Sequence, residues 1–456
     1  MTVAMRAAVG VFAVAVAGAA TPARGAAPTE PTATADGLEA YVGRSFFNNS
    51  WIAAPSSTTA RDGLGPLFNA HACAACHPRG GRGRAPATGG EAPVSLLLRL
   101  WLPPEASAAT GSSSSGDRPP SATSSFHPPV GEPTYGNQLQ TRGIVSGPAR
   151  VPAEGRLFIE YETSRVTLDD GEVVELRRPV PKLRELGYGP MREDVCFSLR
   201  IAPSLRGVGL LAAIPDSALR MRADPDDADG NGISGRARRT LDRATGAEGL
   251  GRFGHRALQP TIEQQVGSAF RDDVGITNAL FREESCSDAQ TACRGAPSGA
   301  SKETGVEIDE RILDAVITMA ARLPAPPAPA AGTEATAGAT LFERAGCGGC
   351  HLASDVAASD RPQAFPYTDL LLHDLGPGLA DRCDEPGASG SEWRTAPLWG
   401  IGRVPAEQRA FLHDGRARSV TEAILWHGGE AEPARRFFAG LDRGERDELI
   451  AFIESR

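Results

Sequence analysis

The sequence predicts a mainly α-helical protein made of two copies of one module, with a β-hairpin and long loops inserted into the first copy. Three observations support this prediction. A short pattern of residues occurs twice along the chain. Gly and Pro contribute 52 and 36 of the 456 residues, which predicts many turns and long irregular connections. Two apolar segments flank a short polar turn in the first half, as in a hairpin.

The repeated unit is a Leu-Phe pair, four further residues and then Cys-x-x-Cys-His. It occupies residues 67–77 and residues 341–351 with the same spacing. A weaker echo follows each copy: Arg200-Ile-Ala-Pro203 leads to a Gly-Val-Gly sequence, and Arg394-Thr-Ala-Pro397 leads to Gly-Ile-Gly. Chance recurrence is the alternative explanation for this echo, but the longer pattern indicates two copies of one module.

Cys-x-x-Cys-His is the attachment motif of a c-type haem. Each thiol adds across one vinyl group of the porphyrin, and the adjacent imidazole reaches the iron. A lone Cys-x-x-Cys also suits a zinc half-site or a redox dithiol, but both leave the histidine unexplained. We therefore predict two covalently bound c-type haems, held by Cys73, Cys76 and His77 and by Cys347, Cys350 and His351.

Changes in composition along the chain mark the boundaries of the predicted segments. A Ser/Pro/Gly-rich tract cannot bury a core and predicts a loop, and a Pro/Ala-rich tract predicts a linker. In the hairpin, residues 157–161 and 173–176 flank Asp169-Asp170-Gly171. The predicted order is a signal peptide (1–26), the first haem-attachment segment (37–103), a low-complexity insertion (104–132), the remainder of the first module (133–323), a linker (324–332) and a C-terminal domain (333–456).

The first residues predict export. Arg6 precedes an apolar run over residues 7–20, and small residues follow, as in a cleavable secretory signal. The run is shorter than the ~20 residues that span a bilayer, so an uncleaved anchor is the less favoured alternative. No later stretch suits a membrane span. We expect a periplasmic or otherwise exported protein, in a compartment where disulfides form.

Four further cysteines remain, which is an even number. Cys286 and Cys293 are close in sequence and suit one bridge, and Cys196 with Cys383 would be the remaining pair. Three connectivities are possible, and the sequence does not choose among them. A free buried thiol at Cys196 is the alternative.

No Met follows His351, so a downstream Met cannot be the sixth ligand of the second iron. His427 is the preferred candidate, because Ser419-Val-Thr-Glu422 is a capping-box pattern and starts a helix whose inner face includes His427. His413 is the alternative. His373 is a third candidate for this ligand, and Tyr367 or no ligand at all are further alternatives. Any of these histidines also suits a purely hydrogen-bonding role.

The first haem has fewer ligands near it. His71 is too close to Cys73 in sequence, His255 is remote, and Met191 and Met221 lie in no ligand motif. We therefore expect the first haem to be the open site where peroxide binds. Peroxide chemistry needs a polar group that moves a proton, and the predicted distal groups are Gln138 and Gln140.

A calcium-like loop lies in the first module. Asp227, Asp229 and Asn231 occupy positions 1, 3 and 5 of an EF-hand pattern, and the carbonyl of Ile233 occupies position 7. Position 12 is Arg238, where the pattern requires Glu, so a solvated turn is the alternative. We predict a calcium site at these four residues.

Several longer segments are typical of one family. They include Asp62-Gly-Leu-Gly-Pro-Leu-Phe-Asn69, Gly251-Arg-Phe-Gly254, Trp393-Arg-Thr-Ala-Pro-Leu-Trp-Gly400, Phe411-Leu-His-Asp-Gly-Arg416 and Trp426-His-Gly-Gly-Glu430. With these segments, the chain resembles the bacterial di-haem oxidoreductase family of peroxidase-like proteins, from about residue 40 to the end. More distantly, it resembles di-haem cytochrome c peroxidases and the enzymes that mature tryptophan-derived quinones.

The resemblance implies two cytochrome c-like helical domains, with one haem passing electrons and the other meeting peroxide. Some relatives bind calcium between these domains. The chain departs from the family at two positions: Leu375 replaces a Met, which removes a possible thioether ligand, and His255 replaces a Trp.

We expect an exported di-haem c-type cytochrome oxidoreductase that reduces peroxide or a related oxidant at one haem. Electrons would come through the other haem from a small redox protein or a quinol-linked donor, and Trp393 and Trp399 suit either the electron path or core packing. The net charge of -9 argues against nucleic acid or an anionic membrane as partner. The alternatives are an electron-transfer cytochrome c with two six-coordinate haems and a structural partner in metal uptake.

Overall fold

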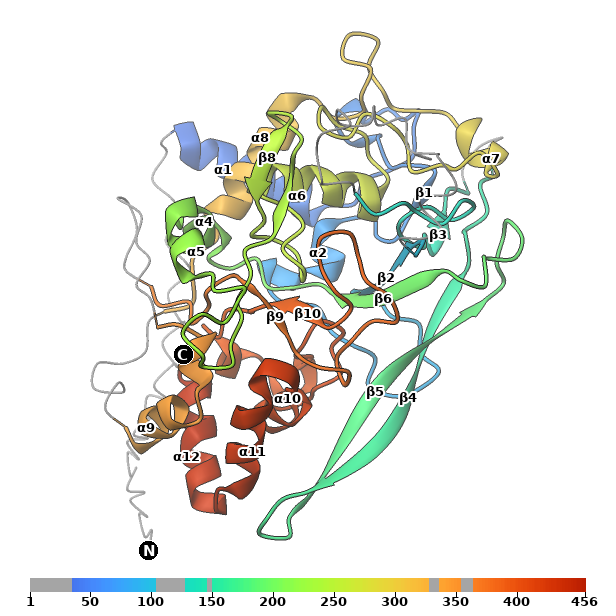
Figure 1. Ribbon diagram of the computed structural model, residues 1–456. Coiled ribbons are helices and arrows are strands. Elements are labelled where there is room, and N and C mark those ends of the chain that lie inside the picture. Colours follow the sequence, from blue (N-terminus) through green and yellow to red (C-terminus); the bar gives the residue numbers. More distant parts are fainter. Residues whose placement is uncertain (1–34, 104–127, 146–149, 328–335, 354–363) are drawn as a thin grey trace, which may run out of the picture.

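The computed structural model describes residues 35–103, 128–145, 150–327, 336–353 and 364–456 (Figure 1). The predicted signal peptide, most of the low-complexity insertion and part of the predicted linker lie outside the described residues. Within these ranges, every helix is too short or too polar to cross a membrane.

The prediction of a mainly α-helical protein with two cytochrome c-like helical domains is wrong. Of the described residues, 30% are helical and 19% are in strands, and the strands form several small sheets. The frequent Gly and Pro residues that predict irregular connections also keep the helices short, because neither residue continues a helix well. Each haem motif itself forms about one helical turn, not the start of a long helix.

The residues before the predicted linker are called the first half of the chain, and those after it the second half. The helices of the first half lie mostly on one side of the molecule (Figure 1). They are α1 (Ala35–Asn48), α2 (Cys73–Cys76), α4 (Val208–Ala213), α5 (Asp216–Arg222), α6 (Ile262–Ala269), α7 (Thr291–Arg294) and α8 (Glu310–Ala321). The second half contains α9 (Ala337–Arg344), α10 (Val420–Trp426), α11 (Glu432–Gly440) and α12 (Arg443–Glu454).

The strands of the described residues pair into five two-stranded antiparallel sheets. The pairs are β1 (Leu67–Phe68) with β3 (Arg142–Gly143), β2 (Leu96–Trp101) with β6 (Cys196–Ile201), β4 (Arg156–Thr167) with β5 (Val173–Arg184), β7 (Arg239–Asp242) with β8 (Ala247–Leu250), and β9 (Leu372–Asp374) with β10 (Glu392–Arg394).

Among the hydrophobic clusters of the described residues, the two largest lie one in each half of the chain. In the first core, Trp51 and Phe270 pack against residues of α1 and α8. In the second, Phe342 of α9 packs with Phe438 of α11 and Phe452 of α12. Each core buries the apolar face of several short helices, which supplies the stability that a single short helix lacks.

The hairpin β4–β5 connects the two halves. The sequence predicted a hairpin around Asp169-Asp170-Gly171, and the structure forms a longer one that extends from the first half to the helices of the second (Figure 1). Leu176 belongs to the second core, although it comes from the first half of the sequence. At the tip, Arg446 Nη2 donates to Asp170 Oδ2 at 2.6 Å and to Glu172 Oε2 at 2.8 Å.

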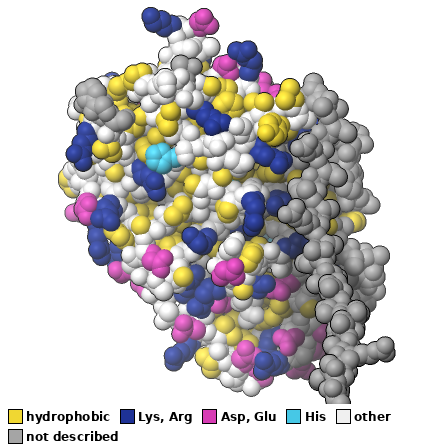
Figure 2. All heavy atoms as spheres, turned by 180° about the vertical axis from the view of Figure 1, so that it is seen from behind, with side chains coloured by type: hydrophobic (Ala, Val, Ile, Leu, Met, Phe, Trp, Pro, Cys, Tyr) yellow, Lys and Arg dark blue, Asp and Glu magenta, His cyan; other side chains and the backbone are white. Residues whose placement is uncertain are grey.

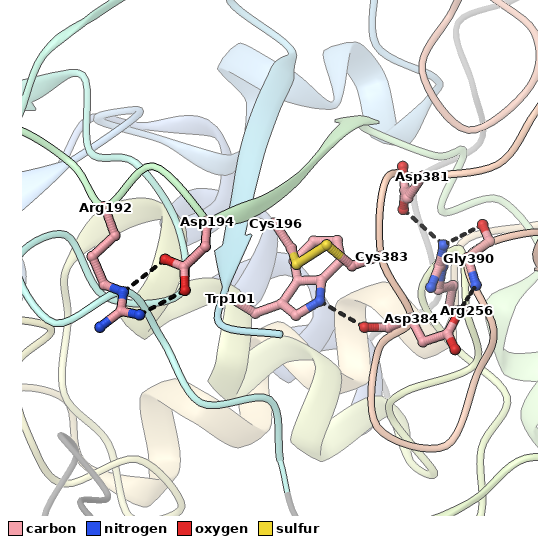
Figure 3. The surroundings of a disulfide bond; sticks show 9 residues. All are labelled: Trp101, Arg192, Asp194, Cys196, Arg256, Asp381, Cys383, Asp384 and Gly390. Atoms are coloured by element: carbon pink, nitrogen blue, oxygen red, sulfur yellow. Dashed lines mark hydrogen bonds and ion pairs between the residues drawn. A yellow bond between two sulfur atoms is a disulfide. The ribbon is translucent and has the colours of Figure 1, made fainter. Parts of the chain in front are cut away.

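Both disulfides named in the sequence analysis are present: Cys286–Cys293 and Cys196–Cys383. The second joins the start of β6 to the segment between β9 and β10 (Figure 3). Beside it, Trp101 Nε1 donates to the Asp384 carbonyl at 2.8 Å. This bond therefore links residues from the two halves of the sequence.

The surface carries charges of both signs. On the face in Figure 2, basic side chains are scattered over the broad part of the molecule, and many of the acidic side chains lie towards its narrow end. Apolar side chains lie between them on the same face.

Candidate functional site

The first Cys-x-x-Cys-His motif forms a single helical turn. The backbone N–H of His77 donates to the Cys73 carbonyl at 2.9 Å, which brings the imidazole back beside the two thiols. Nδ1 of His77 donates to the Pro203 carbonyl at 2.9 Å, so Nε2 remains as a possible metal ligand. Burial lowers the pKa of His77 and keeps the ring neutral, the form that binds metals.

The second motif repeats this arrangement. His351 N–H donates to the Cys347 carbonyl at 2.9 Å, and Nδ1 of His351 donates to the Tyr367 carbonyl at 3.0 Å. The acceptor is not Pro397, the counterpart of Pro203 in the weaker sequence echo. Burial lowers the pKa of His351 to about 4, and an electrostatic contribution from His427 acts in the same direction.

A cavity of about 840 Å³ lies beside the first motif. Its wall includes Cys73, Cys76 and His77, together with residues from both halves of the chain. Its size is typical of a pocket for a cofactor or another small molecule. Two thiols outside the disulfides, a neutral imidazole and a roomy cavity fit a covalently attached haem.

The wall of this cavity is strongly basic. Nine arginines and three carboxylates line it: Arg79, Arg82, Arg99, Arg200, Arg206, Arg252, Arg256, Arg394 and Arg403 against Asp272, Asp273 and Glu385. Burial lowers the pKa of Arg82, Arg200 and Arg394 to about 10. A haem carries two acidic propionates, so an excess of guanidinium groups is a suitable environment for it.

Gln138, one of the two predicted distal residues, lines the cavity. Its amide donates to Asp273 Oδ1 at 2.9 Å and accepts a hydrogen bond from Arg99 at 3.2 Å. Gln140 does not line the cavity, and its amide donates to the Asp272 carbonyl at 2.8 Å and accepts from Asn69 at 2.7 Å.

Asp273 was missed by the sequence analysis, because it lies in no motif. It belongs to a single π-helical turn, Phe270–Val274, of a kind that often occurs at functional sites. Burial raises the pKa of Asp273 to about 6, although the hydrogen bond from Gln138 opposes the shift. A carboxyl group with this pKa exchanges a proton readily near neutral pH.

His255 also lines the first cavity, although it is remote from the motif in sequence. Its Nε2 donates to the Ile201 carbonyl at 2.7 Å. Burial, and then the positive charge of Arg200, lower the pKa of His255 to about 3, so the ring is neutral. The chain thus places a neutral imidazole in the wall of the cavity.

At the second motif, His427 lies where α10 ends. One half of the predicted capping box forms: the Ser419 hydroxyl accepts a hydrogen bond from the Glu422 N–H, and the helix runs to Trp426. The Glu422 carboxylate accepts from the N–H of Arg418 and not from that of Ser419. Nδ1 of His427 donates to the Ala423 carbonyl at 2.6 Å, so Nε2 is its possible ligand atom. Burial lowers the pKa of His427 and keeps it neutral.

The competing histidines have other partners. His373 Nε2 lies 2.8 Å from Asp369 Oδ2, and its Nδ1 lies 2.7 Å from Glu430 Oε2. Burial alone would lower the pKa of His373, but the hydrogen bonds to these carboxylates and to Cys350 raise it to about 12. Both ring nitrogens of His373 are therefore protonated and engaged, which does not suit an iron ligand.

His413 stacks on Trp393, with the ring centres 3.6 Å apart, and the guanidinium groups of Arg200 and Arg256 also lie over Trp393. Trp399, the other aromatic residue considered for an electron path, lines the first cavity.

The calcium-like loop has its own internal hydrogen bonds. Asp227 Oδ1 accepts from the Gly232 N–H at 3.1 Å, and Asn231 Oδ1 accepts from the Ile233 N–H at 2.7 Å. The carboxylates of Asp224, Asp227 and Asp229 lie within 4.8 Å of one another. Asp224 precedes the EF-hand pattern and was not predicted. Calcium binding here stays a prediction.

Comparisons with known proteins give one clear result. No curated protein matches the chain. Among solved structures, the chain is similar to hydrazine synthase of Kuenenia stuttgartiensis, with a TM-score of 0.33 and 13% identity over 98% of this chain and 100% of the other, a likeness too weak to support an argument. The sequence model of one family, described as "Di-haem oxidoreductase, putative peroxidase", matches residues 13–456. The chain therefore belongs to the di-haem oxidoreductase family.

Proposed function

We propose that this di-haem oxidoreductase is an exported, peroxidase-like enzyme that reduces peroxide at the first haem with electrons relayed through the second. The observation that carries the proposal is the difference between the two haem sites. His77 lies in the wall of a large cavity, whereas His351 interacts electrostatically with the imidazole of His427. In this proposal the oxidant would meet the haem of the first site, and Nε2 of His427 would be the second nitrogen ligand of the other.

In this proposal, Cys73 and Cys76 would hold the first haem and His77 would be its iron ligand. Cys347, Cys350 and His351 would do the same for the second haem. The backbone carbonyls of Pro203 and Tyr367 fix the tautomer and direction of the two imidazoles. Bound in the cavity, a haem supplies an iron that exchanges single electrons with an oxidant.

Residues of the cavity wall would transfer the proton of the peroxide. Reduction of a peroxide needs a base that accepts its proton and an acid that returns it. Asp273 suits this role because burial raises its pKa to about 6. Gln138 holds the carboxyl group through its amide, and Arg99 in turn holds Gln138.

Spectra of the purified holoprotein test the proposal. The protein should be made in a host competent for cytochrome maturation and examined in the oxidised and half-reduced states. One high-spin haem whose spectrum changes with hydrogen peroxide, and a second low-spin haem, are expected. Two low-spin haems that are inert to peroxide in every redox state would instead identify an electron carrier.

The carrier is the second candidate function, and one observation favours it. His255 adds a neutral imidazole to the wall of the first cavity, which makes a second nitrogen ligand available to the first iron. The variant His255→Phe distinguishes the two functions. It leaves the spectra unchanged in the enzyme, but it converts one low-spin haem to high spin in the carrier.

A further inference from the structure

One part of the cavity wall contains arginine nitrogens without a hydrogen-bond partner among the described residues. Nε and Nη1 of Arg256 and Nη1 of Arg200 are buried and make no hydrogen bond among the described residues. Arg256 is 2% exposed, and both side chains line the cavity. Buried N–H groups of native proteins are nearly always satisfied, so these groups indicate that something else completes the site.

The charges in this cluster do not balance. Within the part of the chain that the structure describes, Arg200, Arg238 and Arg256 lie within 4 Å of only two carboxylates, Asp381 and Glu385. One positive charge remains, and the neutral rings of His255 and His413 do not offset it. A buried charge without a counter-ion is costly, so the cluster favours an additional anion.

The two guanidinium groups are also held in place. Both lie over the ring of Trp393, with the carbon atoms of the groups 4.4 and 4.5 Å from the ring centre. Arg256 Nη2 donates to Asp381 Oδ2 and to the Gly390 carbonyl, both at 2.7 Å. Asp381 lies in the segment that the Cys196–Cys383 disulfide joins to β6 (Figure 3). The free nitrogens therefore cannot turn to another protein acceptor without disturbing these contacts.

We propose that Arg200 and Arg256 form a carboxylate-binding site in the wall of the first cavity. Two guanidinium groups side by side match the two oxygens of a carboxylate. Either a propionate of the first haem or a free carboxylate that enters the cavity supplies this chemistry. The proposal rests on haem occupying the cavity and does not depend on peroxide as the oxidant.

Infrared spectroscopy of the wild-type holoprotein tests the first source. Haem labelled with ¹³C in its propionate carboxyl groups makes those carboxyls visible in spectra recorded as the pH is lowered. A propionate held by two guanidinium groups stays ionised after the free propionates protonate. Titration with acetate tests the second source, because a free carboxylate gives a saturable change in the haem spectrum.

Three variants link either result to the cluster. Arg256→Gln removes the charge, Arg256→Lys keeps it, and Arg192→Gln is the control. Arg192 pairs with Asp194 on the other side of the same disulfide, where its side chain is 41% exposed (Figure 3). We expect Arg256→Gln to abolish the retained ionisation or the acetate response, Arg256→Lys to weaken it and Arg192→Gln to leave it unchanged.

The infrared and acetate experiments either support or contradict the carboxylate-binding site. Retained ionisation of a labelled propionate, or saturable acetate binding, supports the site and names its ligand, provided that Arg256→Lys weakens it. If every labelled carboxyl of the wild-type protein protonates like a free acid and acetate produces no saturable change, the proposal is wrong, even if Arg256→Gln fails to fold. None of these measurements uses peroxide, so this result is independent of the proposed peroxidase activity.

Discussion

Burial sets the protonation state of the side chains around the first cavity. It lowers the pKa of His77 and His255, so both imidazoles are neutral at physiological pH. It raises the pKa of Asp273 towards neutrality. The same desolvation therefore makes the histidines suitable as metal ligands and the carboxyl group suitable for proton transfer.

Replacing Asp273 with Asn should reduce peroxide turnover about 10²-fold or more, because a positioned acid–base group contributes at least that much. The wild-type rate should rise with pH through about 6, since only the ionised Asp273 accepts a proton and its pKa is raised to about 6. The variant should lose this rise. Steady-state rates across pH test both points, with exposed Asp194→Asn as the control. An unchanged pH profile in Asp273→Asn would exclude this role.

Replacing His427 with Ala should convert the second haem from low spin to high spin, because it removes the imidazole near His351. The electronic spectrum of the reduced holoprotein reports this change directly. His71→Ala is the control, because its partly exposed ring packs at a tilt against Phe68, a residue of the first core. If the spectrum of His427→Ala matches that of the wild type, another group binds the second iron.

The sequence predicts the residues that chemistry fixes locally and misses those that only the fold brings together. Cys73, Cys76 and His77 follow from their spacing alone. Asp273, His255 and Arg256 lie far from the motif in sequence. The sequence analysis set His255 aside as remote and did not consider Asp273 or Arg256. Their shared cavity depends on the packing of distant segments, which local propensity does not encode.

For helices and strands too, features fixed by local sequence were predictable, and those that depend on distant segments were not. The helix that begins after Ser419 was predictable, because its capping hydrogen bond and its apolar face are local features. The hairpin was predictable from its turn, but its length and its packing against the second core were not. The error in fold class has a similar origin, since the haem motif specifies one turn of chain and leaves the surrounding segments free to form small sheets.

Leu176 provides a test of the hairpin as a connection between the halves. It is 3% exposed and packs in the second core, so Leu176→Ala should lower the free energy of unfolding by about 2–5 kcal/mol. Val173→Ala is the matched control, since Val173 lies on the same strand but is 54% exposed and should change stability by about 0.5 kcal/mol or less. Urea denaturation measures both. Equal effects would show that the hairpin does not stabilise the second half.

For the whole molecule, the two halves are less separate than the repeated motif suggests. The first cavity is lined by residues from both, including Arg82 and Arg394. The hairpin of the first half contributes to the second core, and the cluster at Trp393 combines arginines of the first half with carboxylates of the second. A change in one half should therefore affect the haem environment formed by the other.

The Cys196–Cys383 disulfide should stabilise the whole molecule more than its local counterpart. It joins residues 187 positions apart, whereas Cys286 and Cys293 are 7 apart. Loop-closure entropy then predicts losses of about 5 and about 2 kcal/mol when each pair is replaced by Ser. Denaturant unfolding of the two holoprotein variants measures the difference. A larger loss in Cys286→Ser/Cys293→Ser would show that the long-range bridge does not hold the two halves together.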